Sequence, residues 1–217
     1  MRSLAAAAAV TAAALVFAAT GEAQKPPKPR PVTLKASADT VTFSTPLTLT
    51  GSVQGEKGGV IVALERRATT SAPFVAAGTA TTDAKGDFSF SERPPVNTVY
   101  RAIAATAPPA TSAEVTAAVA PLVGLRTGDS TPRKGRRVRF RGTVRPAHDG
   151  RRVAIQRRSA DGTWRTVAAP RLRDAGSVYS SYSRRLRIRR SGTYRTVIAA
   201  HADHAQGTSR ERTLTVH

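Results

Sequence analysis

Apolar and polar residues alternate in short runs from Val32 to the end of the chain, and the spacing of an amphipathic helix is missing. Residues 47–53 read LTLTGSV and residues 138–144 read VRFRGTV, a period of two that is typical of strands with one buried face. In the run from Val60 to Leu64, the pattern predicts that Val62 faces the core and that Ile61 faces away from it. The chain is therefore expected to be all-β.

The strand pattern occurs twice, with an offset of 91 residues. The first copy holds Leu34, Leu47, Leu49, Gly51, Val53, Val62, Leu64, Arg66, Arg67 and Asp83, and the second holds Leu125, Val138, Phe140, Gly142, Val144, Val153, Ile155, Arg157, Arg158 and Asp174. After a slip of three residues, Tyr100-Arg101 returns as Tyr194-Arg195. A fixed period is the mark of a tandem array, and the repeated positions are those of a core and its turns.

Turn residues separate the runs into about seven short strands per copy. Asp83 to Asp87 reads DAKGD, with glycine where a positive φ is needed, and Asp161-Gly162 is a hairpin signal before Trp164. Strands of this number and length, in copies of about 95 residues, favour two seven-stranded β-sandwiches in tandem.

The amino terminus predicts export. Arg2 precedes an Ala-rich apolar run from Leu4 to Thr20, and small residues follow up to Ala23, so residues 1–23 are expected to be a cleaved signal peptide. The run has 17 residues, so a retained membrane anchor is the alternative. Residues 24–31 read QKPPKPRP and are expected to form an extended proline-rich spacer. The mature chain is expected to be secreted or associated with the cell surface.

The repeats set the expected domain boundaries. Residues 32–120 and 121–217 form one copy each, and the connection near Ala120-Pro121 is so short that the two sandwiches should sit end to end. The chain has no cysteine, so neither disulfides nor thiol chemistry is available, and each copy depends on packing and strand pairing.

Positive charge is concentrated in the second copy. Residues 24–120 hold 10 Lys and Arg against 7 Asp and Glu, whereas residues 121–217 hold 23 against 6. This asymmetry suggests an anionic partner, and a GC-rich genome that favours Arg codons is the alternative explanation.

Both copies resemble the immunoglobulin-like repeats of secreted and surface proteins from GC-rich Gram-positive bacteria. The resemblance rests on LTLTGSV with VRFRGTV, on VIVALERR (60–67) with RRVAIQRR (151–158), on TTDAKGDFSF (81–90), and on TVYR with GTYR. It implies an immunoglobulin-like fold for nearly all of the mature chain and says little about function. It also implies that Tyr100 and Tyr194 occupy the corner where a tyrosine hydroxyl bonds nearby backbone.

No catalytic motif is present in the sequence. The chain lacks a Gly-x-Ser-x-Gly elbow, a His-Glu-x-x-His pair and a phosphate-binding glycine loop. His201 and His204 share one loop, but two ligands are too few for a structural metal site, so no metal, cofactor or small-molecule substrate is expected. Trp164 matches Phe74 within one position and is expected to pack, with carbohydrate stacking as the alternative.

Arginine alternates with apolar residues on two strands of the second copy, the second and the fifth. Strands B and E of an immunoglobulin fold are neighbours, so their outward arginines should share one face. These candidate polyanion-binding residues are Arg137, Arg139, Arg141, Arg185, Arg187 and Arg189.

Two functions from different classes follow. The first is a non-catalytic structural or interaction protein that binds an envelope component or a protein partner. The second is a module that binds an anionic cell-wall polymer, an acidic polysaccharide or nucleic acid through the arginine face.

Overall fold

A computed structural model describes residues 30–56, 58–68 and 72–217. Within these ranges every regular element is a β-strand and none is a helix, so the all-β expectation is confirmed. The described residues contain no helix long and apolar enough to cross a membrane. The predicted signal peptide (1–23) and most of the proline-rich spacer (24–29) lie outside the described residues, and their assignment stays a prediction.

The first half of the chain forms two sheets. One has the order β1-β3-β6, and the other has the order β2-β9-β7-β4-β5 with β8 beside β7. The strands are β1 (Lys35–Ala36), β2 (Thr40–Thr42), β3 (Leu47–Ser52), β4 (Ile61–Arg67), β5 (Val75–Thr81), β6 (Asp87–Glu92), β7 (Thr98–Ala104), β8 (Ala110–Thr111) and β9 (Val115–Ala120). All pairs are antiparallel except β2 with β9, which run parallel with Thr40 beside Ala118.

The second half repeats this arrangement. One sheet has the order β10-β12-β16-β15 with β11 beside β12, and the other has the order β14-β13-β17-β18 with β19 beside β17. The strands are β10 (Leu122–Val123), β11 (Arg126–Thr127), β12 (Arg137–Arg145), β13 (Ala154–Arg158), β14 (Trp164–Ala168), β15 (Arg173–Asp174), β16 (Ser180–Arg187), β17 (Gly192–Ile198), β18 (Gly207–Thr208) and β19 (Arg212–Leu214).

The strand order is that of an immunoglobulin-like sandwich. The B–E neighbours of that fold correspond to β3–β6 and to β12–β16, and the C–F–G order corresponds to β4-β7-β9 and to β13-β17 with β18 and β19. The described residues form more strands than the seven per copy that the sequence predicts. The additional ones are mostly pieces of two or three residues at the sheet edges, where pairing is interrupted.

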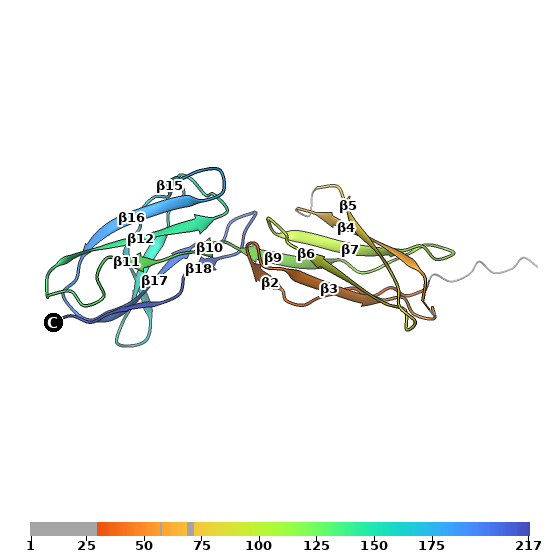
Figure 1. Cartoon of the computed structure of the whole chain (residues 1–217), viewed down its shortest axis with the longest axis horizontal. Helices are drawn as coiled ribbons and strands as arrows, with labels where there is room; N and C mark the ends of the chain where they lie inside the picture. Colours follow the sequence, from red (N-terminus) through yellow and green to blue (C-terminus); the bar gives the residue numbers. More distant parts are fainter. Residues whose placement is uncertain (1–29, 57, 69–71) are drawn as a thin grey trace, which may run out of the picture.

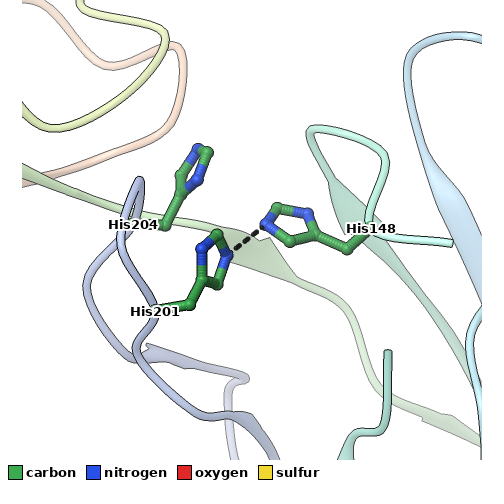
Figure 2. Close-up of side chains that lie close together, drawn as sticks. All are labelled: His148, His201 and His204. Atoms are coloured by element: carbon green, nitrogen blue, oxygen red, sulfur yellow. Dashed lines mark hydrogen bonds between the residues drawn. The ribbon is translucent and has the colours of Figure 1, made fainter. Parts of the chain in front are cut away.

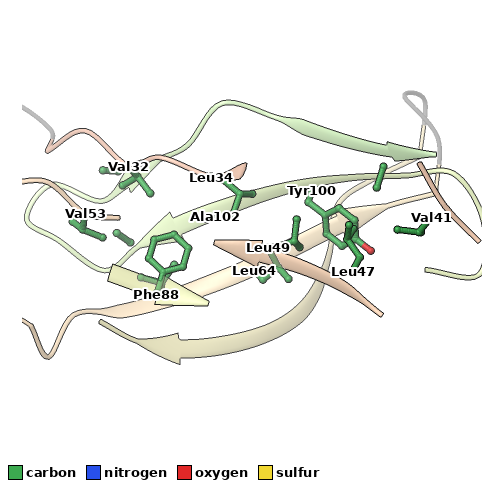
Figure 3. Packing of buried hydrophobic residues seen from close by; sticks show 14 of the residues in the cluster. Val32, Leu34, Val41, Leu47, Leu49, Val53, Leu64, Phe88, Tyr100 and Ala102 are labelled. Atoms are coloured by element: carbon green, nitrogen blue, oxygen red, sulfur yellow. The ribbon is translucent and has the colours of Figure 1, made fainter. Parts of the chain in front are cut away.

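Each half has its own hydrophobic core (Figure 3 shows the first). Leu47, Leu49 and Leu64 are fully buried in the first core, whereas Ile61 on the opposite face of β4 is 57% exposed, as the alternation predicts. The second core contains the equivalent residues Val138, Phe140, Val153 and Ile155. The repeated apolar positions are therefore the two cores.

Two repeated glycines allow strands to approach each other closely. A Cβ added at Gly142 would lie 1.9 Å from the carbonyl oxygen of Gly124, and one at Gly51 would lie 2.1 Å from that of Thr33. Both distances are far inside contact, so any larger residue would push away the segment at Thr33, just before β1, or at Gly124, between β10 and β11. This steric need explains why glycine recurs at the same place in both copies.

The tyrosine corner differs from the expectation. Tyr100 is fully buried in the first core (Figure 3), and among the described residues its hydroxyl forms no hydrogen bond to a backbone group. Burial raises the pKa of Tyr100 to about 12. In the second half a different residue, Tyr182, donates its hydroxyl hydrogen to the carbonyl of Gly124 at 2.8 Å. Tyr100 and Tyr194 are core residues, and the predicted backbone bond of Tyr100 is not formed.

The two halves lie end to end (Figure 1), and Pro121 is the one residue between β9 and β10. The loop between β17 and β18 contacts the first half at this junction. The amide N–H of Asn97 donates to the carbonyl of Asp203 at 2.8 Å, and the N–H of Ala205 donates to the carbonyl of Val119 at 2.9 Å. We predict that residues 32–120 and 121–217 are separate folding units that touch through this loop.

Candidate functional site

The outer face of strands β12 and β16 carries paired arginines. In the antiparallel register Arg137 lies opposite Arg187, and Arg139 lies opposite Arg185. All four are exposed, while Val138 and Phe140 between them are buried. Directly opposed residues share a face of the sheet. Because β12 and β16 are neighbours, as the sequence predicts for strands B and E, four guanidinium groups lie on one surface.

The register also shows which arginines extend this surface. Arg141 lies opposite Ser183 on one side and opposite Arg126 of β11 on the other. Strand β16 ends at Arg187, so Arg189 lies two residues past its end, where it lines a second hollow with Arg157 and Arg187. We call the following set the arginine face: Arg126, Arg137, Arg139, Arg141, Arg185 and Arg187.

A groove of about 770 Å³ runs along one side of the arginine face. Arg126, Arg139 and Arg141 line it together with Arg212 of β19 and with Arg210 from the loop before β19. The Nε–H of Arg212 donates to the carbonyl of Leu125 at 3.3 Å, which ties this edge of the groove to the first strand of the half. The groove therefore collects cations from strands that are far apart in the sequence.

The arginine face has no carboxylate partners. Within the part of the chain that the structure describes, none of its six arginines forms a salt bridge. In the first half, by contrast, Arg66 pairs with Glu92 at 3.0 Å and Arg101 pairs with Glu65 at 2.6 Å. Several arginines of the first half are thus paired with carboxylates, and those of the arginine face are left to solvent or to a partner.

The equivalent face of the first half is mostly neutral. Thr48 lies opposite Ser91 and Thr50 lies opposite Ser89, with Lys35 beside Thr50 in place of Arg126. A fold of the same topology therefore forms without this charge, so the arginines are not needed to build the sandwich.

Other arginines stack on aromatic rings and are structural. Arg101 lies over the ring of Phe74 at 4.0 Å, and Arg195 lies over the ring of Trp164 at 4.2 Å. The two pairs are equivalent in the repeat, so Trp164 is a packing residue covered by an arginine, as expected.

The carboxylates that the sequence places in turns organise those turns. Asp83 Oδ1 accepts hydrogen bonds from the amides of Lys85 and Asp87, and Asp161 Oδ1 accepts from the amide and hydroxyl of Thr163. These bonds hold the pKa of both carboxyls below their ordinary value. A general acid needs the opposite shift, so the two side chains suit turns rather than acid catalysis.

Three histidines meet beside the junction of the two halves (Figure 2). His148 comes from the loop between β12 and β13, and His201 and His204 come from the loop between β17 and β18. The Nε2 atoms of His148 and His201 are 3.0 Å apart, and one nitrogen from each of the three rings lies within 4.8 Å of the others. His148 and His204 are buried, at 7% and 4% exposure.

Sequence analysis missed four of these residues. His148 lies 53 positions before His201, and only the packing of two loops shows that they meet. Arg126 and Arg212 belong to strands of two or three residues, where an alternating pattern is too short to recognise, and Arg210 lies in the loop between β18 and β19. The lopsided charge of the second half was the one signal that pointed to more cations than the six predicted.

Comparison with known proteins adds little to this description. The sequence matches no family model, and no curated protein matches it. Among solved structures, the chain is similar to the D0-D1 domain of Intimin, with 13% identity and a TM-score of 0.31, over 84% of this chain and 97% of that one. The immunoglobulin-like assignment therefore rests on the strand order and the packing of the two halves.

Proposed function

We propose that the chain is a non-catalytic binding protein outside the cytoplasm, and that its arginine face binds a linear anionic polymer. The unpaired arginines carry this proposal: six exposed guanidinium groups share one surface and have no carboxylate partner among the described residues. An envelope component or a protein partner of acidic character fits the same surface. Export is supported by the apolar run from Leu4 to Thr20.

The fold tolerates the positive charge of the arginine face without a ligand. The presence of the arginines therefore does not by itself establish a partner, and binding must be tested directly. Two unit charges about 6 Å apart in water repel by roughly 0.7 kcal/mol, and salt reduces this further. Opposed arginines such as Arg137 and Arg187 can therefore stay solvated without a ligand. The equivalent face of the first half has neutral residues such as Thr48 and Ser91, although the same genome encodes both halves. This difference favours binding, rather than codon usage, as the reason for the arginines of the second half.

Binding to duplex DNA, used as a polyanion of known charge spacing, tests the proposal. Six phosphate contacts give a slope of log affinity against log salt of about −5, from about −0.9 per phosphate. Replacing all six residues of the arginine face with threonine is expected to flatten the slope to near zero. An anionic cell-wall polymer and an acidic polysaccharide, titrated in parallel, rank the natural candidates.

A control of equal charge separates the face from general basicity. It replaces six exposed arginines elsewhere in the second half with threonine, namely Arg133, Arg151, Arg158, Arg165, Arg171 and Arg190. This variant is expected to keep most of the slope. Equal losses from both sextuple variants would show that the protein is merely cationic. Arg189→Thr alone is expected to have a small effect, because Arg189 lies beyond the end of β16.

A further inference from the structure

His148, His201 and His204 form a histidine cluster that is separate from the arginine face. His148 Nδ1 is 2.7 Å from the carbonyl oxygen of Pro146, and His204 Nε2 is 3.0 Å from that of Pro95. A carbonyl accepts, so both of these ring nitrogens carry hydrogen, and the opposite nitrogen of each neutral ring has a free lone pair. Backbone oxygens that fix the ring tautomer in this way are typical of metal-binding histidines.

The lone pair on Nδ1 of His204 accepts no hydrogen bond from the described residues. His204 is 4% exposed, and its Nδ1 is buried without a hydrogen-bond partner. A buried, unsatisfied acceptor beside two further imidazoles is costly unless something binds to it.

We propose that His148, His201 and His204 form a binding site for a divalent transition metal, with zinc as the expected ion. Imidazole suits zinc, copper and nickel, and three histidine ligands leave a fourth position for water or another ligand. With zinc–nitrogen bonds of about 2.0–2.1 Å, tetrahedral geometry separates the ligand nitrogens by about 3.3 Å. In the structure the ring nitrogens of His148 and His201 are 3.0 Å apart, and one nitrogen from each of the three rings lies within 4.8 Å of the others. Small side-chain movements therefore bring the nitrogens to the separation that zinc requires.

In this structure the ring of His201 contacts that of His148 directly, Nε2 to Nε2. Its Nδ1 accepts from the amide of Asp203 at 3.4 Å, which leaves hydrogen on Nε2 to bond His148 Nε2. Zinc binding replaces this N–H···N bond. The ring of His201 then changes tautomer, so that the hydrogen leaves Nε2 and is carried by Nδ1. The bond given up at Asp203 is long and weak.

The site would also strengthen the junction of the two halves. His201 and His204 lie in the loop that reaches the first half, where His204 bonds the carbonyl of Pro95 and the Asn97 amide N–H bonds the carbonyl of Asp203. His148 lies on a different loop of the second half. A metal that joins the two loops fixes the surface on which the first half docks.

Isothermal titration with Zn²⁺ on the untagged mature chain near neutral pH tests the site. We expect one saturable zinc per chain, and a loss of affinity of more than about tenfold in His148→Gln and in His201→Gln. His217→Gln is the matched control, because His217 is the only other histidine and lies at the exposed carboxyl terminus. It is expected to bind zinc like the original chain.

A second measurement keeps the test decisive if a variant folds poorly. In the original chain, NMR signals of the imidazole C–H groups should shift with Zn²⁺ for three histidines and stay fixed for His217, and Co²⁺ should give the intense visible absorption of a four-coordinate site. No saturable binding, or shifts that include His217 equally, would overturn the proposal. This result is independent of polyanion binding, which is measured through the arginine face.

Discussion

The substitution Gly142→Ala should destabilise the second half strongly. The new Cβ would lie 1.9 Å from the carbonyl oxygen of Gly124, and ordinary contact begins near 3.4 Å, so the segment at Gly124 must move by about 1.5 Å. That shift breaks the 2.8 Å bond from the Gly124 amide to the carbonyl of Thr143, and the 2.8 Å bond from the hydroxyl of Tyr182 to the carbonyl of Gly124.

The expected magnitude follows from these contacts. Two neutral hydrogen bonds at about 1 kcal/mol each, with an overpacking strain of about 1–3 kcal/mol, give a loss of about 3–5 kcal/mol. A domain of this size loses roughly 4–8 °C of Tm per kcal/mol, so the Tm should fall by at least about 12 °C.

The assay uses the single tryptophan of the chain. Trp164 lies in the second half, so its fluorescence during urea denaturation reports the unfolding of that half. Gly128→Ala is the control, since its added Cβ meets no atom closer than 3.7 Å, and it should change stability by less than about 1 kcal/mol. Gly51→Ala should leave the Trp164 transition in place if the halves fold separately. The reasoning fails if Gly142→Ala and Gly128→Ala unfold at the same urea concentration.

Three further predictions concern folding, acid stability and processing. Each half expressed alone should give a cooperative calorimetric transition. Val153→Asp should abolish the transition of the second half, because it buries an unpaired charge. The absence of a transition in both isolated halves would contradict the interpretation as two folding units. Hydrogen bonds from Thr163 hold the pKa of Asp161 below 3.8, so its stabilising effect is present above that pH and is lost as the pH falls below about 4. Thermal melts should therefore separate Asp161→Asn from the original chain at neutral pH and bring the two together in acid; a constant difference would refute the assignment. Intact-mass measurement of the exported protein should show cleavage near Ala23, and a mass that includes Met1 would exclude it.

Much of the fold could be predicted because both copies obey the same local rules. A period of two identified Leu47, Leu49 and their counterparts Val138 and Phe140 as inward-facing, and all four are buried. Because side chains alternate strictly on a strand, it followed that Arg139 and Arg185 share one face once the two strands were taken as neighbours; that they lie directly opposite each other comes from the structure.

The remaining features depend on three-dimensional packing. Whether the hydroxyl of Tyr100 finds a partner depends on how deeply its ring enters the core, which the repeat does not encode. The meeting of His148 with His201 depends on two loops that share no sequence pattern. Arg189 was expected on the outer face because alternation was extended past Arg187, where the strand ends.

The parallel pair β2–β9 gives the two halves different mechanical roles. In the first half this pair joins a strand near the start of the sandwich to its last strand, over Thr40 to Thr42 and Ala118 to Ala120. Tension applied along the long axis pulls parallel partners in opposite directions and loads all their hydrogen bonds at once, in shear. Among the described residues of the second half, every strand pair is antiparallel. Under a pulling force the second half should therefore yield first, and the first half should stay folded as the stiffer link.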